Sequence, residues 1–282
     1  MDEKGLGKRL QHARQAAGLT QQGLCQKAGL SYSTLAKIER GAIKSPSIFT
    51  IGQIAAALDT SLDALVGAAN QSISGDLKKR SKSGISFAFF DINGCLVRFF
   101  HRAFTRLAEE SGAPADVIET TFWHYNDAVC RGEMSVETFN QAFAKRLGIT
   151  QLDWLTYYLD AIDPIPEMHE LVRWAASHYQ IGLLSNIMPG FLDVMIEKGF
   201  VPKVPYKAIV DSSKVGFIKP ERQIYEVAQK MAGHEASEIL FVDDSRTNVM
   251  AAEKLGWHVL WFDDYRPDES AKRVRAALEL AA

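Results

Sequence analysis

Apolar residues recur at helical spacing at the start of the chain. The run from Leu6 to Ala17 is apolar on one face, and Gly18 ends it. Thr20 follows as a predicted N-cap, because its hydroxyl can accept a hydrogen bond from the free N–H groups of a first helical turn. Further helices are predicted over residues 21–28, 31–39, 47–58 and 61–66. This part of the chain is therefore expected to be an all-α bundle.

Beyond residue 84 the pattern changes to short apolar runs that end in polar residues and are separated by helical stretches. Such alternation predicts a parallel sheet flanked by helices, an α/β Rossmann-like core. The predicted strands cover residues 85–90, 181–184, 208–210, 239–242 and 258–262.

A long segment, residues 99–163, separates the first two predicted strands. It is too long for a loop and predicts a helical cap subdomain. Its helical patterning covers residues 104–110, 117–128, 136–147 and 152–159.

Residues 67–84 are small, polar and basic, which indicates a flexible linker. The chain is therefore expected to be multidomain. An all-α domain is predicted at residues 1–66 and an α/β domain at residues 85–282, with the cap at about 99–163.

The net charge of −2 hides a difference between the two parts. Residues 1–82 hold 12 Lys and Arg against 6 Asp and Glu, whereas residues 83–282 hold 20 against 28. Within residues 4–58 there are 8 basic residues and a single acid, Glu39. This asymmetry favours a polyanion as the partner of the first domain.

No apolar run approaches the length of a membrane span, and the start of the chain lacks a secretory apolar core. We expect a cytoplasmic protein that does not bind membranes. Cys25, Cys95 and Cys130 form no CxxC pair, and they are interpreted as reduced packing thiols.

The first domain carries its helix signals in a distinctive order. The positions concerned are Thr20-Gln21, Leu24, Ala28-Gly29-Leu30-Ser31, Leu35, Ile38-Glu39-Arg40-Gly41, Pro46-Ser47 and Thr50-Ile51. Together they resemble the lambda-repressor-like helix-turn-helix family over residues 4–66. The resemblance implies double-stranded operator DNA as the partner and a homodimer on paired half-sites.

In such a domain the start of the recognition helix presents polar side chains to the major groove. If Leu35 and Ile38 face the core, the polar residues around them face outward. We expect base-edge contacts from Tyr32, Ser33 and Lys37, a backbone contact from Thr34, and phosphate contacts from Gln21, Arg40 and Lys44. Glu39 is expected to form an internal pair instead.

In the second domain, four polar clusters lie at or near the ends of predicted strands, where open α/β sheets place their ligands. The clusters are Asp91, Ser185-Asn186, Lys219 within residues 216–221, and Asp243-Asp244-Ser245. A carboxylate at Asp91 can attack phosphorus if a cation screens the two anions, and Asp243 and Asp244 offer the oxygen ligands that Mg²⁺ prefers. Lys219 and Ser185 would neutralise and bind the phosphoryl oxygens.

This constellation resembles the haloacid dehalogenase-like (HAD) hydrolase superfamily over residues 85–265, most closely its sugar-phosphatase and epoxide-hydrolase N-domain branches. The resemblance implies Asp91 as nucleophile and metal ligand. It also implies metal contacts from the Asn93 main-chain carbonyl and from Asp244, with Asp243 acting directly or through water. Phosphate contacts fall to Ser185, Asn186 and Lys219.

Asn93 departs from the family pattern. In the family's phosphatases a second Asp at this position protonates the leaving oxygen and later activates water. An amide can do neither, because it neither gains nor loses a proton near pH 7. The loss is worth roughly 10²–10⁴-fold in rate. Substrates with good leaving groups need less protonation, so the sequence leaves slow catalysis and pure ligand sensing both open.

The cap is expected to select the substrate. Trp123, His124, Asn126 and Arg131 are candidates for its pocket, and Arg131 is the best candidate for a second anionic contact.

The leading hypothesis is a DNA-binding transcription regulator whose second domain binds, and slowly hydrolyses or only senses, a small phosphorylated metabolite with Mg²⁺. The alternative is a Mg²⁺-dependent phosphatase of a sugar phosphate or similar ester with an accessory or autoregulatory DNA-binding module. Carbon–halogen hydrolysis needs no leaving-group acid, but the Asp243-Asp244 pair argues for a metal instead.

Overall fold

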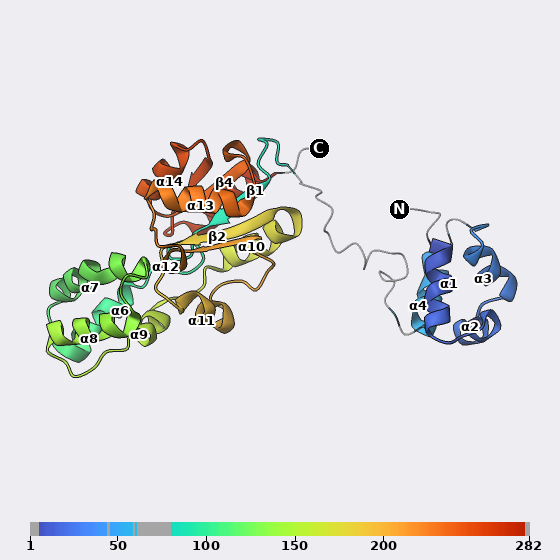
Figure 1. Cartoon of the computed structure of the whole chain (residues 1–282), viewed down its shortest axis with the longest axis horizontal. Coiled ribbons are helices and arrows are strands. Elements are labelled where there is room, and N and C mark those ends of the chain that lie inside the picture. Colours follow the sequence, from blue (N-terminus) through green and yellow to red (C-terminus); the bar gives the residue numbers. More distant parts are fainter. Residues whose placement is uncertain (1–5, 44–45, 59, 61–79, 280–282) are drawn as a thin grey trace. The chain divides into compact units, whose positions relative to one another are not determined.

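A computed structural model describes residues 6–43, 46–58, 60 and 80–279 of the chain. The chain divides into two compact units, residues 1–77 and 78–282 (Figure 1). Each unit is described by itself.

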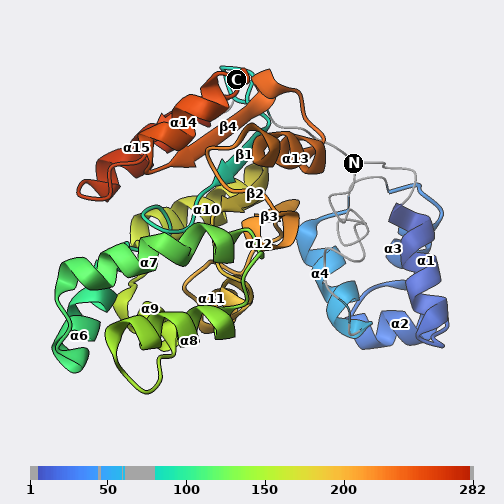
Figure 2. The same cartoon turned by 60° about the vertical axis from the view of Figure 1, so that its left-hand side comes forward.

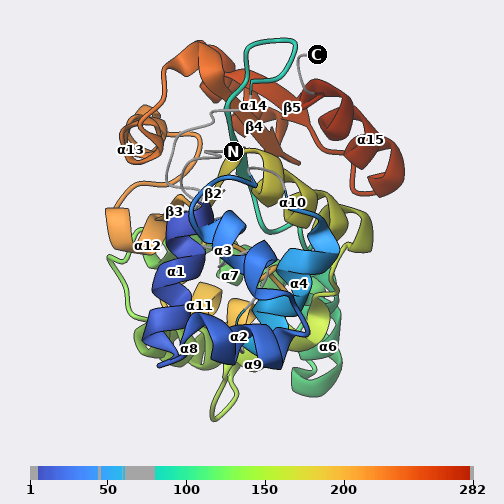
Figure 3. The ribbon, with the colours of Figure 1, turned by 90° about the vertical axis from the view of Figure 1, so that its right-hand side faces the viewer.

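The N-terminal unit contains four described helices around an apolar core (Figure 3). They are α1 (Leu6–Ala16), α2 (Gln21–Ala28), α3 (Tyr32–Glu39) and α4 (Ile48–Ala57). The hydroxyls of Thr20, Ser31 and Ser47 accept N–H groups at the starts of α2, α3 and α4, as predicted. Leu24, Leu35 and other apolar residues of the helices are buried together. The predicted helix at 61–66 lies outside the described residues.

The C-terminal unit is built on a parallel five-stranded sheet with the strand order β3-β2-β1-β4-β5. All five predicted strands are present, with ends shifted by one or two residues. They are β1 (Phe87–Phe90), β2 (Gln180–Ser185), β3 (Ala208–Asp211), β4 (Ile239–Asp243) and β5 (His258–Trp261). The predicted α/β core is thereby confirmed.

Helices cover both faces of the sheet. Alternate residues of each strand point to opposite sides, so each strand packs against both layers of helices. Phe87 and Phe89 of β1 pack with residues of α13 and α14, while Ala88 and Phe90 pack with residues of α10, α11 and α15. Figure 1 shows α13 and α10 on opposite sides of the strands. The helices are α10 (Pro166–His178), α11 (Phe191–Lys198), α12 (Ser212–Val215), α13 (Arg222–Ala232), α14 (Arg246–Glu253) and α15 (Pro267–Ala277), with a short 3₁₀ turn at Ala236–Glu238.

The insertion after β1 is the predicted helical cap (Figure 2). Its helices are α6 (His101–Ser111), α7 (Ala115–Cys130), α8 (Val136–Leu147) and α9 (Trp154–Ala161). Aromatic side chains hold them together, with Phe122 at 4.8 Å from Trp154 and 5.2 Å from Phe104 between ring centroids. The aromatic packing of the cap is continuous with the apolar core on one face of the sheet. Among the described helices, none is both long and apolar enough to cross a membrane.

Candidate functional site

The polar residues predicted at strand ends gather at one edge of the sheet. Asp91 follows β1, Ser185 ends β2 and Asp243 ends β4, and parallel strands place these ends side by side. One carboxylate oxygen from each of Asp91, Asp243 and Asp244 lies within 4.8 Å of the other two. The fold thus builds an acidic cluster from segments more than 150 residues apart.

Lys219 lies inside this cluster. Its Nζ is 2.8 Å from Asp91 Oδ1 and 2.6 Å from Asp243 Oδ2, and the side chain is buried. Burial alone would lower the pKa of the ammonium, but the carboxylates of Asp243 and Asp91 outweigh it and raise the pKa. Lys219 is therefore charged at neutral pH.

Asp243 is held by several neighbours. Besides Lys219, its oxygens accept the Ser245 N–H at 2.8 Å and the Asn248 side-chain N–H groups at 3.1 and 3.2 Å. With both oxygens so engaged, Asp243 is suited to orienting Lys219. Asp91 and Asp244 are the carboxylates better placed to hold a cation directly.

The cluster is short of positive charge. When ionised, its three carboxylates face one ammonium, from Lys219. Burial raises the pKa of Asp91 to about 6, with Lys219 opposing and Asp243 adding to the shift. Burial, followed by the Asp91 and Asp243 charges, raises the pKa of Asp244 to about 8. A divalent cation with oxygen ligands fits such a group of carboxylates.

Gly94 makes room for Asp244. Its φ is +83°, in the left-handed region, and a Cβ at this position would lie 2.1 Å from Asp244 Oδ2. Glycine is required both by the backbone angle and by this close approach.

Ser185 and Asn186 end β2 in different roles. The Ser185 hydroxyl is buried and, among the described residues, has no hydrogen-bond partner, so it is available to a phosphoryl oxygen. The Asn186 side chain donates to the Lys219 carbonyl at 2.9 Å and accepts the Lys219 N–H at 2.7 Å. In this structure the Asn186 amide binds the backbone of Lys219 rather than facing a phosphate.

Asn93 bonds to a residue of the cap. The Tyr158 hydroxyl, on α9, donates to Asn93 Oδ1 at 2.6 Å and lies 3.2 Å from the Met195 sulfur. Tyr158 is buried, and burial raises the pKa of its hydroxyl. The sequence does not single out Tyr158, because nothing in the aromatic pattern of α9 distinguishes it from a packing residue.

A second link joins the cap to the core through Arg131. Its guanidinium pairs with the Glu221 carboxylate, two residues beyond Lys219. The next residue, Gly132, has φ +72°, and a Cβ there would lie 2.4 Å from the Ser213 carbonyl oxygen. The Arg131 guanidinium, predicted to contact the substrate, thus forms an ion pair between cap and core in this structure.

The other cap candidates lie differently. Trp123 and His124 are exposed. The Asn126 side chain accepts the Cys130 thiol at 3.5 Å and donates to Asp127 at 3.3 Å. Cys130 itself is buried, as are Cys25 and Cys95, and all three are free thiols.

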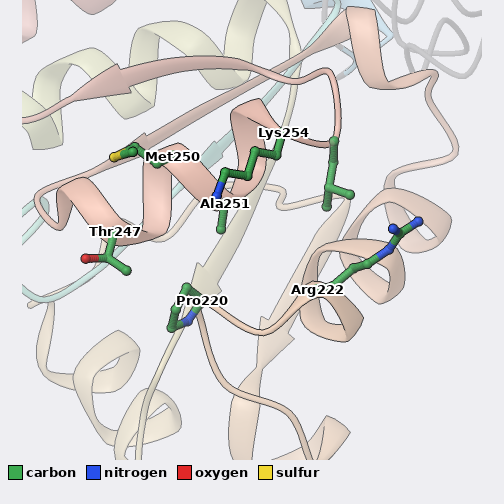
Figure 4. A pocket seen from close by; sticks show the side chains of 7 residues that line it. Pro220, Arg222, Thr247, Met250, Ala251 and Lys254 are labelled. Atoms are coloured by element: carbon green, nitrogen blue, oxygen red, sulfur yellow. The ribbon is translucent and has the colours of Figure 1, made fainter.

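A separate open groove of about 570 Å³ runs between the α14 segment and the chain that follows Lys219 (Figure 4). Its lining comes from Pro220, Arg222, Thr247, Met250, Ala251, Lys254 and Leu255. None of the cluster carboxylates lines it. The candidate site is therefore the acidic cluster, which is identified by its buried reactive groups and not by the volume of a nearby groove.

The recognition-helix candidates are displayed as expected. Tyr32, Ser33, Lys37 and Arg40 are exposed and Thr34 is half-buried, while Leu35 and Ile38 are buried. The Ser31 hydroxyl lies 3.1 Å from the Ser33 hydroxyl and 2.8 Å from that of Thr34. Lys44 lies outside the described residues.

Glu39 forms the predicted internal pair. Its carboxylate receives two hydrogen bonds from Arg14, at 2.7 and 3.0 Å, and one from the Gln21 side chain at 2.7 Å. Burial would raise the Glu39 pKa, but the bonds from Arg14 and Gln21 outweigh it and lower the pKa. Gln21, predicted to contact phosphate, is thus bonded within the domain.

Comparison with known families assigns both domains. The sequence model of the haloacid dehalogenase-like hydrolases matches residues 85–256, and the chain belongs to this family. A helix-turn-helix model matches residues 10–65. The protein therefore combines a helix-turn-helix domain with a HAD hydrolase domain, and both resemblances are confirmed.

Individual relatives are distant. Acyl-CoA dehydrogenase family member 10 of Mus musculus is 22% identical over 218 residues, which cover 72% of this chain and 20% of that protein. This chain thus spans about a fifth of the mouse protein's length.

Solved structures share the fold of the C-terminal unit. A HAD family enzyme of Bacteroides thetaiotaomicron, as a mutant complexed with magnesium and inorganic phosphate, is 18% identical with a TM-score of 0.57, covering 64% of this chain and 95% of that one. A HAD-like hydrolase of Porphyromonas gingivalis is 23% identical with a TM-score of 0.55, covering 68% and 98%. At these identities the likeness shows the fold alone.

Proposed function

We propose that the chain is a ligand-responsive transcription regulator. The helix-turn-helix domain binds operator DNA as a homodimer, and the HAD domain binds a small phosphorylated metabolite together with Mg²⁺. Hydrolysis of that metabolite is slow or absent. The observation that carries this proposal is Asn93: a site with its other charged groups in place lacks the carboxyl group that would transfer protons.

The DNA-binding half of the proposal is supported by the surface of α3. Tyr32, Ser33 and Lys37 project from one helix whose opposite side is buried. The polar groups suit base edges, and Arg40 just beyond the helix suits a phosphate. The buried Arg14–Glu39 pair joins α1 to α3 and so stabilises the position of α3 in the domain.

The donor set of the acidic cluster fits Mg²⁺. Asp91 and Asp244 would hold the ion, with the Asn93 main-chain carbonyl as a further hard oxygen ligand and Asp243 acting directly or through water. When bound, the ion would screen the repulsion between Asp91 and a phosphate. The Bacteroides HAD enzyme was solved with magnesium and phosphate, which supports the same pairing here.

The residues around Asp91 suit phosphate binding. Lys219 would neutralise a phosphoryl oxygen while it holds Asp91 and Asp243, and the unpartnered Ser185 hydroxyl would donate to another oxygen. Asn186 would act by positioning Lys219 through its backbone. Asn93 would add an N–H donor, because its oxygen already accepts the Tyr158 hydroxyl.

DNA binding by the full chain tests the proposal. Fluorescence anisotropy with labelled promoter DNA of its own operon is expected to show salt-dependent binding that changes when Mg²⁺ and a phosphorylated ligand are added together. Lys37→Ala is expected to weaken this binding without loss of helix content. Absence of binding under every Mg²⁺ and ligand condition would overturn the regulator.

A second candidate is a metabolic phosphatase of a sugar phosphate with an accessory DNA-binding module. It is favoured by the close grouping of Asp91, Lys219 and Asp244. A panel of phosphate esters decides between the two. Turnover at ordinary enzyme rates, abolished by Asp91→Asn, would establish the phosphatase.

A further inference from the structure

We propose that Asp91 is a site of lasting phosphorylation. An acyl phosphate donates its phosphoryl group to the Asp91 carboxylate, and the resulting aspartyl phosphate persists because Asn93 cannot activate water. This inference rests on the phosphate site of the proposed function and adds to it a substrate class and a covalent product.

The forward step needs no acid when the donor is an acyl phosphate. An Asp91 oxygen forms a bond to phosphorus, the bond from phosphorus to the acyl oxygen breaks, and a carboxylate leaves with the electron pair. A carboxylate has a pKa of about 4, so it departs unprotonated at neutral pH. A sugar phosphate would instead release an alkoxide, which is a strong base and requires a proton. Asn93 supplies none.

Tyr158 does not replace the missing acid. Its hydroxyl proton is directed at Asn93 Oδ1 at 2.6 Å, so it is turned toward the amide rather than toward a leaving group. The same bond fixes the amide orientation and leaves the Asn93 N–H groups as donors. An amide donor can stabilise a phosphoryl oxygen without transferring a proton.

Ser185, at the end of the neighbouring strand β2, offers a neutral hydroxyl rather than a base. Lys219 bridges Asp91 and Asp243, and Asp244 belongs to the oxygen cluster suited to the cation. The Cys95 thiol is directed at the Val242 carbonyl at 4.0 Å. Around Asp91, the described side chains offer no free base for water.

Hydrolysis of the aspartyl phosphate is therefore slow. Hydrolysis of the aspartyl phosphate requires water to attack phosphorus, give up a proton and release the Asp91 carboxylate. General base help is worth roughly 10²–10⁴-fold, and its absence lengthens the life of the phosphorylated state by that factor. The covalent mark therefore outlasts the donor.

The test treats the full chain with acetyl phosphate and Mg²⁺, removes small molecules, and follows the mass of one added phosphoryl group with time. Borohydride reduction, which converts aspartyl phosphate to homoserine, maps the modified residue in the native chain. The expected result is one phosphoryl group at Asp91, and none from glucose 6-phosphate. In Asn93→Asp, loss of the label is expected to be about 100-fold faster or more.

Asp91→Asn is expected to take up no label, whereas Asp116→Asn, an exposed aspartate of α7, is expected to label as the native chain does. The mapping in the native chain decides the site even if Asp91→Asn does not fold. Calorimetry with inorganic phosphate and Mg²⁺ is run on the same sample. Phosphate binding without labelling, or a label lost equally fast in native chain and Asn93→Asp, overturns the inference and leaves the proposed function standing. If the chain neither takes up the label nor binds inorganic phosphate, both the inference and the proposed phosphate site are overturned.

Discussion

The Tyr158 hydroxyl donates a 2.6 Å hydrogen bond to Asn93 Oδ1 and so ties the cap to the loop that carries Asp91. The two residues are 65 positions apart, and each comes from a different part of the C-terminal unit. This bond gives the half-buried Asn93 amide a fixed orientation. Asn93, which departs from the family pattern, therefore has a defined hydrogen-bond partner in the cap.

Tyr158→Phe removes that donor and leaves the half-buried Asn93 side-chain oxygen without it. We expect the free energy of unfolding to fall by about 1–3 kcal/mol. All five tryptophans lie in the C-terminal unit, so urea denaturation followed by tryptophan fluorescence reports on this unit. Tyr157→Phe on the same helix is the control, because Tyr157 bonds to the exposed Glu110, and it should cost under about 0.5 kcal/mol. Equal effects would contradict the role of Tyr158.

Gly94→Ala places a methyl group against the Asp244 carboxylate. We expect loss of Mg²⁺ binding by calorimetry and a fall in stability above the 1–2 kcal/mol typical of a left-handed residue. Gly112→Ala is the matched control, since its φ is +71° and a Cβ there meets nothing within 4 Å. If both variants bind Mg²⁺ equally well, Asp244 is not the ligand.

Stability of the C-terminal unit in EDTA should depend on pH through Asp91 and Asp244. Their pKa values are raised by burial to about 6 and about 8, above the ordinary Asp pKa of about 4. Between the ordinary and the raised pKa, the folded state therefore binds more protons than the unfolded state. Their contribution to stability therefore falls as pH rises from about 4 to about 8. Mg²⁺ competes with those protons, so stabilisation by Mg²⁺ should grow over the same range.

Thermal unfolding at several pH values, with and without Mg²⁺, measures this effect. Asp244→Asn removes one of the two groups, so the difference between native chain and variant isolates its contribution from other titrations. In EDTA the advantage of the variant should increase with pH. An advantage that shrinks as pH rises would contradict the raised pKa of Asp244.

The Arg131–Glu221 pair should stabilise the contact between cap and core. Both side chains are largely covered, at 25% and 31% exposure, so we expect a coupling free energy of about 0.5–1 kcal/mol or more in a double-mutant cycle of Arg131→Ala and Glu221→Ala. The exposed Arg106–Glu110 pair of α6 is the control and should couple more weakly, because solvent screens it. A coupling free energy no larger than that of the control pair would show that the Arg131–Glu221 pair does not stabilise the contact between cap and core.

In the N-terminal domain, Glu39→Ala leaves Arg14 buried without its carboxylate. We expect the free energy of unfolding of this domain to fall by about 3–5 kcal/mol. The full chain should then lose part of its helical circular dichroism, and DNA binding should be lost with it. Lys37→Ala on the same helix removes an exposed side chain and should weaken DNA binding while the helices stay intact. Folded, DNA-binding Glu39→Ala protein would contradict the role of the pair.

Local structure and the kinds of reactive group follow from the order of residues along the chain. N-cap residues such as Thr20 and Ser47 lie where hydroxyls satisfy free N–H groups, which depends only on neighbours in the chain. The strands were recognisable because buried parallel strands are short and continuously apolar. Asn93 in place of Asp is also visible in the sequence, and so is the loss of proton transfer.

Which groups meet depends on how the chain packs. The sequence predicts ligand contacts for Arg131 and Asn186, whereas in the structure they bond to Glu221 and to the Lys219 backbone. Tyr158 could not be found from α9 alone, because its role depends on where the cap folds onto the core. Such partners are set by packing between distant segments, and a hydrogen bond across 65 residues leaves no periodic signal in the chain.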